Sequence, residues 1–259
     1  MILIPKALLN TVYLGIFMRN RKPFNWSLLD RYNLHSMLNE VGSSIIGKKL
    51  PIAEIHRILS THIKSHIPIR VKYKEDPAQE PGLIYIGGTY YSDYDKQGKR
   101  QVEVILSYCL FDEHLKLTRN RWNRICSLFA DTVLHEIIHM RQYRTRNFKA
   151  IPGYESTAHL AKQRRDQEYY GDKDEMGAFA FNIACELVDK FGYNPTQIWK
   201  YLDSDRAKRN KRSTYLRYLR AFDFNHDHKI IRKMKRKIMR QIENAYLGKP
   251  FKTVDYLTY

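Results

Sequence analysis

Two histidines separated by three residues constrain the fold of this chain more than any other feature. His135 and His139 enclose Glu136 within a run of helically spaced apolar residues that begins after Thr118 and continues to about Tyr143. On a helix, positions i and i+4 lie one turn apart on the same face, so both imidazoles can bind one ion. This arrangement is typical of a zinc site, where the adjacent carboxylate reaches the fourth, water-filled position and acts as general base. A helix carrying a metal centre is therefore expected here.

The chain before this helix changes its apolar spacing once. From Trp26 to His66 the apolar residues recur at helical spacing, which predicts two or more helices before Pro68. Between Ile67 and Cys109 they recur at every second position, with glycines and prolines between the runs, which predicts strands. Three strands of an antiparallel or mixed sheet are expected around Ile69-Val71-Tyr73, Leu83-Tyr85 and Val102-Val104-Leu106, with a polar hairpin tip before the last strand.

A second long helix is expected after the helix that carries the histidines. It begins near Asp172 or Asp174, whose carboxylates suit a helix N-terminus, and its apolar run from Met176 to Val188 is long enough to be largely buried. Beyond Pro195, short helices rich in Lys, Arg and Tyr are expected. The fold class is therefore α+β. We divide the chain into an N-terminal helical segment (1–66), a catalytic domain (67–195) and a basic helical C-terminal extension (196–259).

The charge of the chain is strongly positive. It carries 45 Lys and Arg residues against 27 Asp and Glu residues, a formal net charge of +18 at pH 7. An anionic partner such as nucleic acid or an acidic protein surface accounts for this imbalance, and a solvated basic face accounts for it equally well. No sequence-specific nucleic-acid-binding motif is present, so nucleic-acid contacts are expected to be electrostatic and salt-sensitive. The candidate anionic-ligand surface comprises Arg209, Arg212, Lys233, Lys235, Arg236 and Lys237.

The cysteines and the N-terminus bear on the compartment. Three cysteines without a CxxC pair argue against a disulfide framework and favour a reducing compartment. Lys6 and Asn10 interrupt the apolar opening from Met1 to Met18, its basic cluster comes after the apolar run, and no small-residue cleavage site follows. Neither a signal peptide nor a membrane span is therefore expected. The expectation is a buried or interface-packed segment, with a signal anchor as the alternative.

Two segments of the chain carry a family resemblance. They are His135-Glu-Ile-Ile-His-Met-Arg-Gln142 and Tyr169-Tyr-Gly-Asp-Lys-Asp-Glu175-Met-Gly-Ala-Phe-Ala180. Together they resemble the gluzincin metallopeptidases, and more narrowly small phage and bacterial proteins of that type. The resemblance implies a zincin-like fold, in which a small, mainly antiparallel sheet packs on the motif helix and on a second, ligand-bearing helix, with helical additions at both ends. It also implies Zn²⁺ as cofactor and Glu175 as the third ligand.

Other carboxylates close to Glu175 compete for the position of third ligand. They are Glu168, Asp172 and Asp174. Glu175 is favoured because it alone combines a helical start with two alanines, Ala178 and Ala180, that let two helices approach closely.

The chain departs from the gluzincin pattern in the residues that surround the ligands. Many gluzincins carry an aspartate four residues after the ligand glutamate, where it orients a motif histidine, but that position here is Phe179. Asp131, one helical turn before His135, is a candidate substitute. The residue that stabilises the oxyanion is left open, and the candidates are Tyr154, His159, Tyr169 and Tyr170.

The function expected from these residues is zinc-dependent hydrolysis of peptide bonds. In an endopeptidase of this type Glu136 acts as general base on zinc-bound water, and a sheet edge aligns an extended protein or peptide substrate. The alternative is a catalytically silent or structural protein that keeps a metallopeptidase fold and is associated with nucleic acid or with a virion. A cytoplasmic or virion-associated location is expected in either case.

Overall fold

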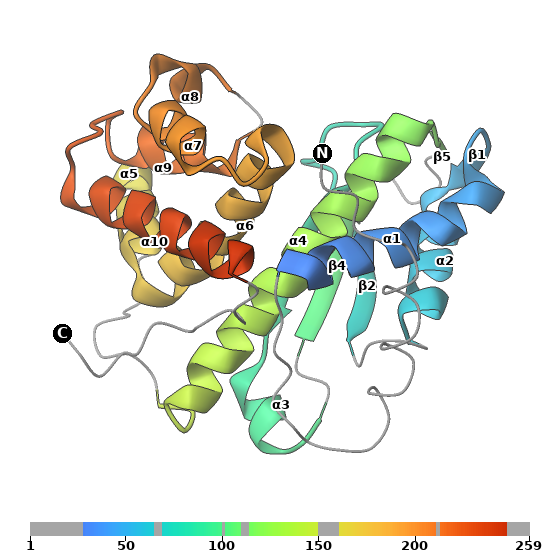
Figure 1. The fold of residues 1–259 in the computed structure, drawn as a ribbon. Coiled ribbons are helices and arrows are strands. Elements are labelled where there is room, and N and C mark those ends of the chain that lie inside the picture. The colour runs from blue at the N-terminus through green and yellow to red at the C-terminus, as the bar shows by residue number, and fades with distance from the viewer. Residues whose placement is uncertain are drawn as a thin grey trace.

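The protein folds into a mixed α+β structure that is mostly helical and contains two small sheets (Figure 1). The computed structural model describes residues 28–64, 69–99, 102–109, 114–149, 161–210 and 213–247. The apolar N-terminal opening, the oxyanion candidates Tyr154 and His159, and Arg212 of the candidate basic surface lie outside the described residues. None of the described helices combines the length and the apolar character that crossing a membrane requires.

Two N-terminal helices form where the apolar spacing predicts them. Helix α1 spans Leu28–Ile45 and α2 spans Ile52–Lys64, and both contribute to the core formed with the larger sheet and α4. Between them lies β1 (Lys49–Pro51), which pairs antiparallel with β5 (His114–Lys116). This pair is not predicted from the sequence, because three-residue strands carry too few side chains to show a period of two.

The larger sheet has three strands in the order β2-β4-β3. Strand β4 (Val102–Tyr108) is central, runs parallel to β2 (Arg70–Glu75) and runs antiparallel to β3 (Tyr85–Tyr90). The sheet is thus mixed, and the expectation of a mainly antiparallel sheet holds for only one of its two pairs. The reason is topological. The chain turns back after β3 through the short helix α3 (Ser92–Lys96), and β4 inserts beside β2, which already runs in the same direction.

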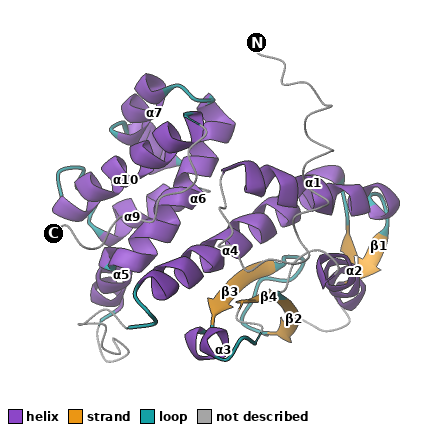
Figure 2. Ribbon diagram, turned by 60° about the horizontal axis from the view of Figure 1, so that its bottom comes forward, coloured by secondary structure: helices purple, strands orange, loops and turns teal. Residues whose placement is uncertain are grey.

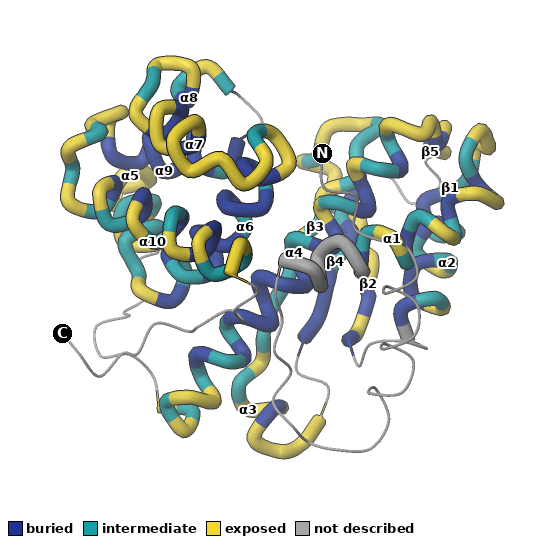
Figure 3. The backbone as a smooth tube through the Cα atoms, in the orientation of Figure 1, coloured by how far each residue is buried: buried dark blue, intermediate teal, exposed yellow. Residues whose placement is uncertain are grey.

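Helix α4 (Arg119–Thr145) is the longest of the described elements and lies at the centre of the fold. The Thr118 side chain caps its start by accepting a hydrogen bond from Arg121 N. The helix packs against β3 and β4, and also against α1 and α6 (Lys173–Phe191). Much of its length is buried, as the tube in Figure 3 shows.

The C-terminal half is entirely helical among its described residues. It comprises α5 (Lys162–Gly171), α6, α7 (Pro195–Leu202), α8 (Asp205–Arg209), α9 (Thr214–Ala221) and α10 (Lys229–Tyr246). Figure 2 shows these helices gathered on one side of α4, with the three-stranded sheet on the other. Helix α6 serves two cores. Ala178 and Phe181 join the core that contains α4 and the sheet, whereas Ile183 and Leu187 join the core that contains α7, α9 and α10.

Candidate metal centre

Three side chains of metal-ligand type converge from two helices. His135 and His139 project from successive turns of α4, and Glu175 projects from the first turn of α6. The two Nε2 atoms lie 3.1 Å apart, Glu175 Oε2 lies 3.4 Å from His135 Nε2, and Glu175 Oε1 lies 3.5 Å from His139 Nε2. Within the described part of the chain, these three residues form the group that could hold one metal ion. Each offers one ligand atom, and the three ligand atoms all lie within 4.8 Å of one another.

The hydrogen bonds around the two imidazoles indicate which ring nitrogen carries the proton. Gln142 Nε2 donates to the carbonyl oxygen of Asp174 at 2.9 Å, which fixes the orientation of the amide. Gln142 Oε1 therefore faces His139 Nδ1 at 2.9 Å and accepts its proton. On the other ring, His135 Nδ1 lies 3.5 Å from the Asn182 amide, whose Oδ1 is buried without a partner. Turning this amide over lets Asn182 Oδ1 accept the proton of His135 Nδ1, because amide oxygen and nitrogen are assigned from their hydrogen bonds.

With both Nδ1 atoms protonated, the neutral rings direct two Nε2 lone pairs into the same space. Two lone pairs at 3.1 Å repel each other unless a cation or a proton lies between them. Glu175 Oε2 adds a buried carboxylate oxygen that accepts no hydrogen bond. A tetrahedral zinc ion with bonds of about 2.0–2.1 Å places its ligand atoms about 3.3–3.4 Å apart, close to the separations found here. The donor set and its spacing therefore fit a metal ion with two imidazoles and one carboxylate.

Glu136 lies next to this group and is held by strand β3. Its side chain is buried, and its carboxylate accepts a hydrogen bond from the backbone N–H of Tyr90. A Cβ atom at Gly88 would come within 2.7 Å of Glu136 Cγ and Oε1, so only glycine at that position leaves room for this side chain. Burial raises the pKa of Glu136, although His135 and His139 act in the opposite direction. A carboxylate with a raised pKa is suited to accept a proton from water.

The charges of the three ligand-type side chains are strongly coupled in the metal-free protein. Burial disfavours ionisation of Glu175, but its contacts with His135 and His139 outweigh burial and lower its pKa. Burial likewise disfavours a charged His139, but Glu175 and Glu136 outweigh it and raise the pKa of His139 to about 9. A proton on His139 therefore takes the place that a cation occupies when metal binds.

The competing carboxylates occupy other positions. Asp172 caps α6 by accepting hydrogen bonds from the backbone N–H groups of Asp174 and Glu175. The Asp174 carboxylate makes a two-pronged ion pair with Arg146, with N–O distances of 2.7 and 2.6 Å. Glu168 is half-exposed on α5. The structure thus brings Glu175, and none of its three competitors, to the two histidines.

An aromatic cluster surrounds the His135 side of the centre. Phe179 packs edge-on against the His135 ring, with ring centroids 4.7 Å apart, in the position where many gluzincins carry an aspartate. Tyr169 and Tyr170 of α5 and Tyr218 of α9 surround Phe179. Burial raises the pKa of Tyr169, and the adjacent Glu175 carboxylate adds to the shift. Of the two tyrosine candidates for the oxyanion that the structure describes, Tyr169 is therefore the one assigned to a position beside a ligand-type side chain.

Gln142 and Asn182 are two residues of the site for which no role is predicted from the sequence. Both were detectable in principle from helical spacing. Gln142 follows His139 by three residues, and Asn182 follows Glu175 by seven, so each lies on the same helix face as a ligand-type side chain. Asp131, the candidate substitute, lies near Glu186 of α6 and helps to raise the pKa of that buried carboxyl, for which burial is the main cause.

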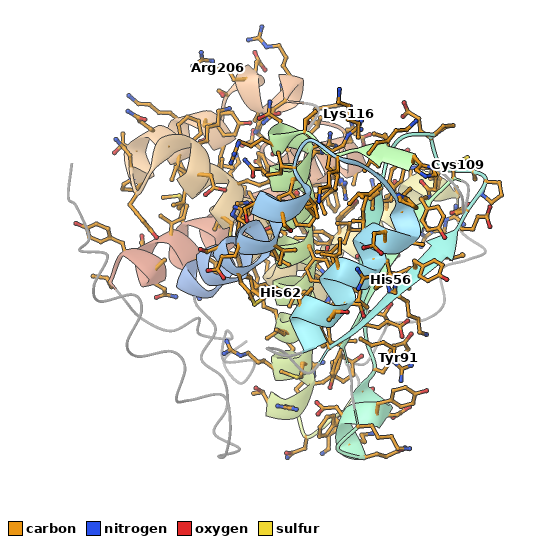
Figure 4. All side chains as sticks on the ribbon, turned by 90° about the vertical axis from the view of Figure 1, so that its right-hand side faces the viewer. His56, His62, Tyr91, Cys109, Lys116 and Arg206 are labelled. Atoms are coloured by element: carbon orange, nitrogen blue, oxygen red, sulfur yellow. The ribbon has the colours of Figure 1, made fainter. Side chains whose placement is uncertain are left out.

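Two other histidines have structural partners away from this centre. Both lie on α2, as Figure 4 shows. His56 Nε2 lies 3.1 Å from the carbonyl oxygen of Val71, and His62 Nε2 lies 3.1 Å from that of Met37. Each ring thus connects α2 to a neighbouring element, β2 or α1.

Some residues of the candidate basic surface are not exposed to solvent. Lys235 is a correction: it is buried, forms an ion pair with Asp203 and donates to the carbonyl of His226, because its position on α10 faces inward. Lys237 is half-buried, and burial together with the charges of Lys233 and Arg240 lowers its pKa to about 8. The exposed cations of α10 are Lys229, Arg232, Arg236 and Arg240, and Arg209 of α8 is also exposed.

The three cysteines are free and buried, which agrees with the absence of a disulfide framework.

Comparisons with protein-family models, curated proteins and solved structures find no match to this chain.

Proposed function

We propose that this protein is a zinc-dependent endopeptidase of gluzincin type. The observation that carries the proposal is the convergence of two imidazole Nε2 atoms and one buried carboxylate at separations of 3.1, 3.4 and 3.5 Å, with Glu136 beside them. Two imidazoles and one carboxylate are the ligand set of several zinc peptidases, and they favour zinc over Mg²⁺ or Ca²⁺, which prefer oxygen ligands.

The chain supplies the groups that such a reaction needs. When bound, zinc polarises the scissile carbonyl and lowers the pKa of water. His135, His139 and Glu175 would hold the ion, and Glu136 would accept the proton of the attacking water and return it to the leaving amine. Tyr169, whose side chain interacts with Glu175, would donate a hydrogen bond to the charge that develops on the carbonyl oxygen.

Strand β3 is the element that would align the substrate. Among the described strands it pairs with β4 alone, so it forms an edge of the sheet, and α4 packs beside it. An extended peptide can add to such an edge through backbone hydrogen bonds. Tyr90 N–H already binds Glu136, so β3 connects the substrate-aligning edge to the general base.

Hydrolysis of unfolded casein by purified protein, together with zinc analysis of the same sample, tests the proposal. Wild type should contain close to one zinc per chain and cleave casein. Glu136→Gln should keep the zinc and lose at least about 10²-fold in kcat, since it removes the general base. Zinc without hydrolysis would favour the alternative, a silent or structural protein on a metallopeptidase fold.

A second candidate function is electrostatic binding of nucleic acid by α10. Lys229, Arg232, Arg236 and Arg240 recur every three or four residues, which places four exposed cations along one side of the helix. If they contact phosphates, the logarithm of the binding constant for duplex DNA should fall with the logarithm of salt concentration with a slope of about −3 to −4. Arg236→Gln should reduce the slope by about one. Arg164→Gln, the same charge change on α5, is the matched control.

A further inference from the structure

Gln142 makes hydrogen bonds to both helices that form the candidate metal centre. Its Oε1 accepts from His139 Nδ1 on its own helix, and its Nε2 donates to the Asp174 carbonyl at the start of α6, each at 2.9 Å. We infer that Gln142 is a positioning residue, which fixes the His139 ring and the start of α6 together so that Glu175 meets the two histidines. The inference rests on the metal centre proposed above and concerns how that centre is assembled.

The two hydrogen bonds of Gln142 require one orientation of its side-chain amide. If the amide were turned over, its oxygen would face the carbonyl oxygen of Asp174, and its NH₂ group would face His139 Nδ1. The side chain is buried, so water cannot replace either partner, and each bond lost leaves a buried polar group unsatisfied. The position of the α6 backbone therefore determines the orientation of the His139 ring, and the same bond holds Asp174, the residue that precedes Glu175.

Gly177 leaves the space that this side chain needs. A Cβ atom at Gly177 would come within 2.7 Å of Gln142 Nε2. Glycine inside a helix costs about 1 kcal/mol relative to alanine, so alanine would stabilise α6 if the space were free. The glycine lies two residues after Glu175, on the side of α6 that faces Gln142.

Two further contacts hold the same end of α6. The Asp174 carboxylate pairs with Arg146, one turn beyond Gln142 on the chain that leaves α4, and both side chains are largely buried. Asp172 caps the helix through the N–H groups of Asp174 and Glu175. These contacts fix where α6 begins, but of the three only the Gln142 bond also reaches a metal-ligand histidine.

The test is the zinc dissociation constant, measured by competition with a chromophoric chelator, for single and double variants. Loss of a group that orients a metal ligand typically weakens metal binding by about 10–100-fold. We expect that loss for Gln142→Leu and a similar loss for Gly177→Ala. In the Gln142→Ala background, Gly177→Ala should have almost no further effect, because the clash has been removed. Circular dichroism and melting of the metal-free proteins establish that each variant is folded.

Matched controls separate positioning from general packing. Gln241→Leu removes a buried glutamine on α10, and Gly171→Ala adds a methyl group at a helical glycine whose nearest contact is Ile230 Cδ1 at 4.0 Å. Both should bind zinc as wild type does. If Gln142→Leu fails to fold, the Gly177→Ala comparison in the two backgrounds still tests the inference.

The outcomes distinguish this inference from the proposed activity. Unchanged zinc affinity in folded Gln142→Leu and Gly177→Ala, or equal effects of Gly177→Ala in both backgrounds, would overturn it. Absence of zinc binding by wild type would overturn both the inference and the metal centre. The expected affinity pattern in a protein that cleaves no peptide would uphold the inference and contradict the endopeptidase proposal.

Discussion

Gly88 of β3 lies directly against Glu136 of α4, so close that a Cβ atom there would stand 2.7 Å from the Glu136 carboxylate. The neighbouring Gly87 has nothing within 4 Å of the same position. Two adjacent glycines of one strand therefore differ in a way that tests the role of Glu136.

We predict that Gly88→Ala displaces Glu136 and lowers kcat on casein by about 10²-fold, because a misplacement of about 1 Å has that effect on a positioned catalytic group. Zinc content should remain that of wild type, since the ligands are untouched. Gly87→Ala is the control and should keep its activity. Equal activities of the two variants would contradict the position assigned to Glu136.

Tyr169 is predicted to stabilise the developing negative charge. Tyr169→Phe should lower kcat by about 10²–10³-fold, the usual effect of losing one oxyanion donor, with little change in KM or zinc content. The control is Tyr193→Phe, because Tyr193 is exposed and packs on Tyr246. A variant with wild-type kcat would shift the assignment to Tyr154, His159 or Tyr170.

The pH dependence of metal binding follows from His139, whose pKa is raised to about 9 in the metal-free protein. At pH 7.5 zinc must displace this proton, so about one proton should be released per ion bound, as calorimetry in buffers of different ionisation enthalpy would measure. Zinc affinity should therefore rise with pH until about pH 9. Binding without proton release at pH 7.5 would show that His139 is neutral before zinc binds.

The same pKa shifts contribute to the pH dependence of the stability of the metal-free protein. Because the pKa of His139 is higher in the folded protein than in the unfolded chain, protonation of His139 stabilises the fold. This contribution to stability is complete below about pH 6.5 and is lost as pH rises through about 9. The lowered pKa of Glu175 acts at the other end: its contribution is present above about pH 4.5 and is lost as pH falls. Urea unfolding of metal-free protein should thus show greater stability at pH 6 than at pH 9, and His139→Gln should weaken that difference.

Trp122 is predicted to anchor α4 in its core. Its side chain is fully buried, and its ring packs against the backbone of α1 at Gly42. Trp122→Ala should lower the free energy of unfolding by about 3–5 kcal/mol. Leu128→Ala on the same helix removes a side chain that is 39% exposed and should cost much less. Denaturant unfolding measures both variants, and equal losses would contradict the packing described.

The sequence predicts those features that depend on neighbouring residues. Helix α4, the capped start of α6 at Asp172 and the inward alternation of Val104 and Leu106 all follow from local spacing and side-chain chemistry. The convergence of His135, His139 and Glu175 follows from that spacing together with the family resemblance.

The remaining features depend on contacts between distant residues. The bond from Gln142 to Asp174 spans 32 residues, as does the pairing of Lys235 with Asp203. The sequence alone does not predict that Asp174 is the partner of Gln142 or that Asp203 is the partner of Lys235. Each helix has several faces, and local spacing does not determine which faces of two helices pack together. The same holds for β4, which pairs in parallel with β2 although β3 lies between them in the chain.

The most direct test of the central claim is zinc content, measured by elemental analysis of wild type, Glu175→Ala and Glu168→Ala prepared in parallel. Glu168 is the control because it is a half-exposed glutamate seven residues earlier that pairs with Arg164. We predict about one zinc per chain in wild type and in Glu168→Ala, and almost none in Glu175→Ala. Zinc retained by Glu175→Ala, or absent from wild type, would contradict the account.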